Sequence, residues 1–126
     1  MTSPLLTLDL VNECKKRLLT MKQDLLNRIR TSASGFVVAD RAGGDEIDLT
    51  VALLEEHSFL INHERLRHQL MEIEFALARI EQGTFGFCEE TEEPIEVERL
   101  IAIPWTRLSI EGAELREALG RKFART

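Results

Sequence analysis

The sequence predicts a mainly α-helical protein with a long antiparallel coiled-coil hairpin, a small globular end and a C-terminal helix. Two stretches carry apolar residues at alternating spacings of three and four, which is typical of helices that pack along a partner helix. The adjacent glycines Gly43 and Gly44 lie between these stretches and indicate a chain reversal. The last third of the chain is rich in apolar residues but lacks a long helical period.

The first helix is expected from about Leu8 to Thr31. Thr7 is the predicted N-cap, and Asp9 places a carboxylate in the first turn, where the helix dipole favours negative charge. The pattern breaks at Thr31–Gly35, so a loop is expected there. The apolar seam of this helix consists of Val11, Cys14, Leu18, Met21, Leu25 and Ile29.

The second helix is expected to begin near Asp45 or Glu46 and to end at Gly83. It is the longer of the two, so its surplus length must pack on the C-terminal third of the chain. One seam position holds the polar residue His63. The apolar seam positions are Leu49, Ala52, Phe59, Leu66, Leu70, Ile73, Leu77 and Ile80.

Residues 84–111 are expected to form short strands or turns around a small core, with Phe87 and Trp105 at its centre. Pro94 and Pro104 interrupt this stretch. A last helix is expected from about Glu111 to Ala124. The predicted domains are therefore a hairpin over residues 7–82, with its tip near 36–48, and a globular domain over residues 83–126.

Composition narrows the class of protein. The 126 residues are 44% hydrophobic and 30% charged, which fits one globular domain. The sequence has no apolar run long enough to cross a membrane and no signal-peptide pattern, so we expect a cytoplasmic protein. The net charge of −6 argues against direct DNA binding. Residues 39–98 hold four basic and sixteen acidic residues. This acidic block is either a solvated helix surface or a surface that meets cations or a basic protein.

The sequence offers no catalytic motif. It has no glycine-rich phosphate loop, no dinucleotide fingerprint and no serine-centred elbow. His57, His63 and His68 are spaced by six and five residues and so do not share a helix face, which argues against a helix-borne metal pair. We therefore expect no enzymatic activity and no cofactor.

A set of short motifs follows in order along the last third of the chain: Gly83, Phe85-Gly86-Phe87-Cys88, Pro94-Ile95, Arg99-Leu100, Ala102 and Pro104. This set resembles the DksA/TraR family of bacterial transcription factors, and the resemblance covers roughly residues 7–119. It implies a coiled-coil protein that binds RNA polymerase directly. Such a protein enters the secondary channel of the enzyme with its acidic tip near the active site and destabilises promoter complexes.

The resemblance also assigns residues at the tip of the hairpin. The family motif Asp-x-x-Asp-x-Ala matches Asp45, Asp48 and Thr50, with threonine in place of alanine. Read without the family, the two aspartates are ordinary helix N-terminal charges. Arg65 and Arg99 match basic positions of the family and are candidates for docking on the polymerase.

The family's four-cysteine zinc site is degenerate in this sequence. Its ligand positions correspond to Cys88, Thr91, Ser109 and Gly112, so the spacing is intact but a single thiolate remains. Structural zinc requires a closed set of four ligands, so we expect a degenerate zinc-finger-like fold that binds no metal. The pattern resembles the zinc-independent branch of the family.

The resemblance further bears on guanosine tetraphosphate, the alarmone that family members bind together with the polymerase. The family's basic residues for this ligand correspond to Glu72, Ile103 and Ala113. None of these is basic, and a phosphate cluster needs cationic or amide donors. We expect alarmone synergy to be weak or absent.

Two other functions stay open at this point. A Gre-like factor that stimulates transcript cleavage would share the hairpin and its acidic tip, with carboxylates that hold a second magnesium ion. A coiled-coil adaptor or dimerisation module would have no role at the polymerase. We expect a monomer and not a self-dimer, because two seams within one chain can satisfy each other.

Overall fold

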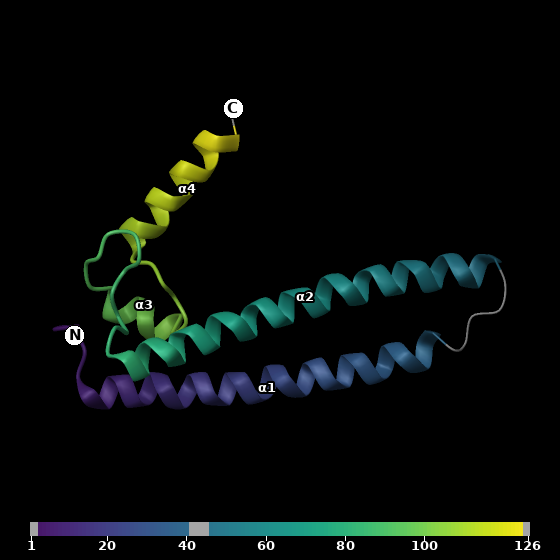
Figure 1. The fold of residues 1–126 in the computed structure, drawn as a ribbon, viewed down its shortest axis with the longest axis horizontal. Coiled ribbons are helices and arrows are strands. Elements are labelled where there is room, and N and C mark those ends of the chain that lie inside the picture. The colour runs from purple at the N-terminus through teal and green to yellow at the C-terminus, as the bar shows by residue number, and fades with distance from the viewer. Residues whose placement is uncertain (1–2, 41–45, 125–126) are drawn as a thin grey trace. The chain divides into compact units, whose positions relative to one another are not determined.

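The computed structural model describes residues 3–40 and 46–124, and the side chains of residues 3–32 and 49–122. In this part of the chain four helices follow one another (Figure 1): α1 (Leu8–Asp40), α2 (Glu46–Gln82), α3 (Val97–Ala102) and α4 (Ile110–Ala124). The predicted mainly helical fold class is confirmed. Among the described helices none is long and apolar enough to cross a membrane.

The chain forms two compact units. One combines Met1–Thr20 with Glu72–Thr126, and the other is Met21–Met71. In each unit a segment of α1 lies along a segment of α2 (Figure 1). The predicted division into residues 7–82 and 83–126 stays a prediction. The predicted seams supply buried residues to both units: Cys14, Leu18, Leu25, Leu66 and Ile73.

We expected the apolar seam of α2 to extend back to Leu49, but it does not. Leu49 is 59% exposed. It shares one side of the helix with Leu53 and Leu60, which follow it by four and eleven residues and are also exposed. The apolar pattern at the start of α2 therefore does not mark a buried face.

The N-terminus of α1 is capped as predicted, because the Thr7 hydroxyl accepts a hydrogen bond from the Leu10 backbone N–H at 3.2 Å. The predicted break at Thr31–Gly35 is wrong, since α1 continues to Asp40. The Thr31 hydroxyl donates to the Asn27 carbonyl at 2.9 Å, one helical turn back, and so stays within the helix. A single glycine costs a helix only about 1 kcal/mol, which the rest of the helix tolerates.

The C-terminus of α2 lies at Gly83, as predicted. Gly83 has a φ of +74°, which suits glycine at the residue after a helix. Its N–H donates to the Ile80 carbonyl at 3.3 Å, and the Thr84 N–H donates to the Arg79 carbonyl at 2.9 Å. This pair of bonds satisfies two carbonyls that the helix leaves open and fixes where the chain departs from α2.

Of the expected short strands or turns, the globular end is built mainly from turns. In the described residues its only β pairing is an isolated antiparallel bridge between Phe87 and Pro94, and the short helix α3 follows. Phe87 and Trp105 are half-buried, so the expectation that they form the centre was wrong. The core cluster instead consists of Leu6, Cys14, Phe85, Cys88, Ile95 and Leu100.

Local backbone geometry explains this exchange of core residues. Gly86 has a φ of +93°, a conformation that suits glycine, and it lies between the buried Phe85 and the half-buried Phe87. Next to Trp105, the buried position is taken by Pro104. Neither choice of inward side chain follows from hydrophobicity alone.

Candidate functional site

The loop that begins at Cys88 is closed by its own backbone. The Cys88 N–H donates to the Glu93 carbonyl at 2.8 Å, and the Glu92 N–H donates to the Cys88 carbonyl at 2.9 Å. Glu92 takes a φ of +62°, which is uncommon for a residue other than glycine. The loop therefore turns tightly, and it keeps Cys88 at 2% exposure in the core.

A second loop meets the first at the start of α4. The Ser109 hydroxyl accepts a hydrogen bond from the Gly112 N–H at 3.0 Å, so Ser109 caps the N-terminus of this helix. The Glu89 N–H donates to the Arg107 carbonyl at 2.8 Å and joins the backbones of the two loops. These bonds fix Ser109 and Gly112 beside Cys88.

The four degenerate zinc positions thus come together in space. The side chains of Thr91 and Ser109 both hydrogen-bond to the sulfur of Cys88. A Cβ atom added at Gly112 would lie 2.4 Å from this sulfur. Burial raises the pKa of the Cys88 thiol, but the hydrogen bonds from Ser109 and Thr91 outweigh it and lower the pKa to about 6. The hydrogen bonds therefore favour the thiolate form of Cys88.

These residues do not fit a structural zinc ion. The set offers one thiolate, two hydroxyls that are donating to that thiolate, and a glycine without a side chain, whereas structural zinc takes four nitrogen or sulfur ligands. The sulfur also approaches the position where a side chain at residue 112 would begin. Among the described residues, no group of three or more His, Cys, Asp or Glu side chains could hold a metal ion.

Replacing Gly112 by alanine is expected to destabilise the folded chain by about 1–3 kcal/mol, because the new Cβ atom overlaps the Cys88 sulfur. Urea unfolding of the full chain measures this effect. Gly120→Ala is the matched control, since a Cβ atom there meets nothing within 4 Å. The control is expected to be neutral or stabilising by up to about 1 kcal/mol. Equal effects of the two substitutions would contradict the close contact.

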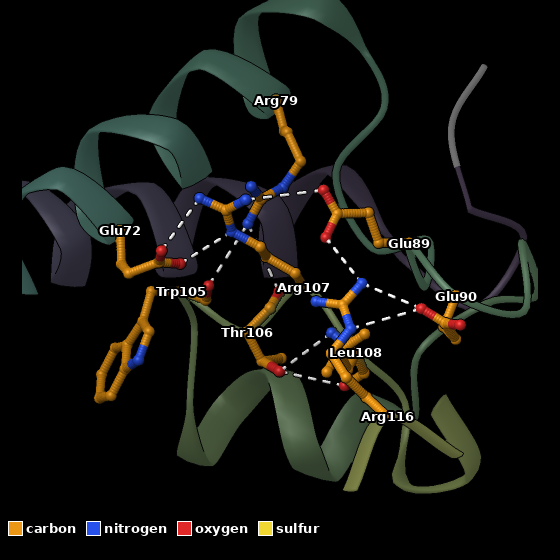
Figure 2. A network of polar contacts seen from close by, with 9 residues as sticks. All are labelled: Glu72, Arg79, Glu89, Glu90, Trp105, Thr106, Arg107, Leu108 and Arg116. Carbon is orange, nitrogen blue, oxygen red and sulfur yellow. Dashed lines mark hydrogen bonds and ion pairs between the residues drawn. The ribbon is translucent and has the colours of Figure 1, made fainter. Parts of the chain in front are cut away.

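A network of arginines and glutamates connects the loop that begins at Cys88 with α2 and α4 (Figure 2). The Arg107 guanidinium forms a two-pronged ion pair with Glu72 of α2, with Nε–Oε2 at 2.8 Å and Nη2–Oε1 at 3.0 Å. The same group lies 4.7 Å from the ring centre of Phe75 and 3.6 Å from Glu89. Sequence reasoning missed this network, because its members are up to 35 residues apart and no local pattern joins them.

The candidate docking residues are placed differently from one another. Arg65 is exposed on α2. Arg99 of α3 is half-buried, and its Nε donates to the Leu108 carbonyl at 2.8 Å, so this side chain also supports the approach to α4. Arg116 of α4 pairs with Glu90 at 3.0 Å and with Glu89 at 3.4 Å.

The tip residues lie at the edge of the described chain. Asp45 lies outside the described residues. Asp48 belongs to the first turn of α2, but its side chain lies outside the described part. Thr50 is exposed on the same helix. The expected tip motif therefore maps to the N-terminal end of α2.

Comparison with known proteins agrees with this architecture. The family model of the prokaryotic dksA/traR C4-type zinc finger matches residues 83–118. The RNA polymerase-binding transcription factor DksA of Caulobacter vibrioides is 33% identical over 103 residues, which cover 82% of this chain and 72% of that protein. An uncharacterized protein of Aquifex aeolicus is 35% identical over 114 residues, covering 84% of this chain and 75% of its own length.

The solved structures include a close match to the whole chain. The structure of transcription factor DksA2 from Pseudomonas aeruginosa superposes with a TM-score of 0.82 at 31% identity, over 90% of this chain and 88% of that one. The similarity thus includes the long helices as well as the globular end that the family model matches. Together, the sequence identity to DksA and the shared fold show that the chain belongs to the DksA/TraR family.

Proposed function

We propose that this protein is a non-enzymatic transcription regulator that binds RNA polymerase through the secondary channel of the enzyme. The observation that carries the proposal is the similarity to DksA2 over nine-tenths of the chain, at a TM-score of 0.82. A relative of 33% identity is named for its binding to RNA polymerase. The long helices and the globular end are both part of that similarity, so the parts that such binding would use are present.

In this proposal the hairpin carries Asp45 and Asp48 toward the active site of the polymerase, and promoter complexes lose stability. The start of α2 at Glu46 supports the assignment, because Asp48 then belongs to the first turn of this helix. Arg65 is exposed and available for docking on the polymerase surface. The chain would act as a monomer.

In this proposal the protein folds and regulates transcription without a bound zinc ion. Support comes from Cys88, whose sulfur already accepts hydrogen bonds from Thr91 and Ser109, and from Gly112, which offers no ligand. Alarmone synergy would be weak or absent. The Glu72 carboxylate supports this part, because it is engaged by Arg107 and adds negative charge where a polyphosphate would need cations.

The double substitution Asp45→Asn/Asp48→Asn is expected to abolish inhibition of a ribosomal RNA promoter by purified RNA polymerase, because it removes both tip charges. Transcription is measured with the full chain and with chelator present throughout. Glu55→Gln/Glu56→Gln is the matched control, because it removes the same charge from two exposed residues farther along α2. This control is expected to inhibit as the wild type does.

Two results would overturn the proposal. If the wild-type chain is folded but has no effect on transcription, the binding function is wrong. If the tip variant inhibits as strongly as the wild type, the tip mechanism is wrong although binding stands. Cleavage of the transcript in a backtracked complex, stimulated by the wild type, would instead favour the Gre-like function.

A further inference from the structure

In a C4-type finger, zinc cross-links the two loops that carry its ligands. In this chain the corresponding loops are the one that begins at Cys88 and the one that leads into α4. In this chain Cys88 provides one thiolate, and its hydrogen bonds reach only Thr91 and Ser109. One backbone bond, from the Glu89 N–H to the Arg107 carbonyl, joins the loops directly at 2.8 Å. These contacts leave open what ties the two loops to the long helix α2.

Arg107 makes the contacts that such a tie requires. Its carbonyl belongs to the segment that leads into α4, and its guanidinium reaches Glu72 on α2 through two bonds of 2.8 and 3.0 Å. The Nη1 atom lies 3.6 Å from the Glu89 carboxylate of the first loop. The planar guanidinium also stacks over Phe75 of α2, 4.7 Å from the ring centre. Figure 2 shows Arg107 between Glu72 and Glu89.

The surroundings make this ion-pair cluster stronger than a surface pair. The side chains of Arg107 and Glu72 are only 26% and 22% exposed, so water and salt screen them less than a fully exposed pair. Arg79 lies beside them and donates to the carbonyls of Trp105 and Thr106, both at 3.4 Å. Burial, and then the charge of Arg107, lower the pKa of Arg79, while Glu89 and Glu72 offset that repulsion. Two carboxylates thus balance two guanidinium groups.

A second set of contacts extends the cluster outward to α4. Arg116 pairs with Glu90 at 3.0 Å and with Glu89 at 3.4 Å. Its side chain is 48% exposed, so these pairs are screened and contribute less. The cross-link is therefore centred on Arg107.

We infer that the cluster of Glu72, Arg107 and Glu89 replaces the zinc ion of a C4-type finger as the cross-link of the globular end. The cluster fastens the first loop and the segment before α4 onto α2. Cohesion of this part of the protein then depends on charge pairing and not on a metal. The inference concerns the fold and stands whether or not the protein regulates transcription.

Urea unfolding of the full chain in the presence of chelator tests the inference. Arg107→Gln is expected to raise the unfolding equilibrium constant about tenfold or more, because it removes the two-pronged partner of the partly buried Glu72 carboxylate. Arg28→Gln breaks the exposed pair with Asp24, whose members are 63% and 59% exposed, and is the matched control. The control is expected to change the constant by about twofold.

Local and pairwise measurements distinguish a cross-link from general destabilisation. Amide hydrogen exchange at Glu89, whose N–H bonds to Arg107, is expected to accelerate in Arg107→Gln and to stay unchanged in Arg28→Gln. The double variant Glu72→Gln/Arg107→Gln is expected to lose less unfolding free energy than the two single variants lose together, since neither charge is left without its partner. If Arg107→Gln fails to fold, Arg107→Lys keeps the charge without the two-pronged pair and is expected to have a smaller effect in the same direction.

Three results would overturn the inference. The first is that Arg107→Gln and Arg28→Gln change the unfolding equilibrium constant equally. Where Arg107→Lys replaces Arg107→Gln, the same comparison is made with Arg107→Lys. The second is strict additivity of the Glu72 and Arg107 substitutions. The third is a wild-type chain that loses stability on chelation and regains it with added zinc, because a metal would then hold the loops.

Discussion

Leu100→Ala is expected to destabilise the protein by about 2–5 kcal/mol, the cost of an unfilled cavity in a core. Leu100 lies in α3 and is fully buried in one cluster with Phe85 and Ile95. The midpoint of urea unfolding, followed by circular dichroism, measures the loss.

The next residue provides the control for this prediction. Ile101 is 45% exposed on the same short helix, so Ile101→Ala removes little buried surface and is expected to cost less than about 1 kcal/mol. Both substitutions leave alanine in a helix, so helix propensity changes little between them. Equal losses in the two variants would show that the core of the globular end lies elsewhere.

A rise in pH from 6 to 8.5 is expected to stabilise the folded chain through Cys88. The pKa of this thiol is lowered from 9.0 to about 6 in the folded state. The stabilisation is therefore fully present above pH 9 and is lost as the pH falls through 6. A shift of this size corresponds to a maximum on the order of 4 kcal/mol.

Comparison with Cys88→Ala isolates the contribution of this thiol from those of all other groups. The difference in unfolding free energy between wild type and variant is expected to grow steadily between pH 6 and 8.5. Thiolate absorbance near 240 nm provides a direct check on the wild type. Burial raises the pKa of the Cys14 thiol in the folded state. Cys14 therefore destabilises the folded chain only near and above the pKa of this thiol in the unfolded state, which lies above the range from pH 6 to 8.5. A difference that is constant with pH would contradict the lowered pKa.

The sequence patterns predicted the long helices well, because seam periodicity and capping are local signals. Thr7 and Gly83 mark ends of α1 and α2 through bonds that span five residues or fewer. The same local reasoning fails at Thr31–Gly35, where a run of small residues predicts a loop but the chain is helical. The Thr31 hydroxyl bonds back to its own helix, and the helix continues.

The globular end was harder to predict, since its elements are short. α3 has six residues, too few to display a helical period. Which of the neighbours Phe85 and Phe87 lies inside depends on the turn at Gly86, not on side-chain type.

The candidate site shows the same division between spacing and tertiary contact. The resemblance to the family's zinc-ligand pattern pointed to Cys88, Thr91, Ser109 and Gly112 as a related set, and the fold brings them together. Their chemistry, a thiolate that accepts two hydroxyl donors, depends on side-chain directions that no spacing encodes. The Glu72–Arg107 pair joins positions 35 residues apart and could not be found without the fold.

The closeness of Gly112 to the Cys88 sulfur also bears on how such a chain can change by single mutations. A cysteine that arose at position 112 would begin with a Cβ atom 2.4 Å from that sulfur, so its first effect would be a loss of stability with no ligand set completed. Position 112 therefore opposes a stepwise gain of a four-cysteine set, because a first cysteine there has a steric cost and completes no ligand set.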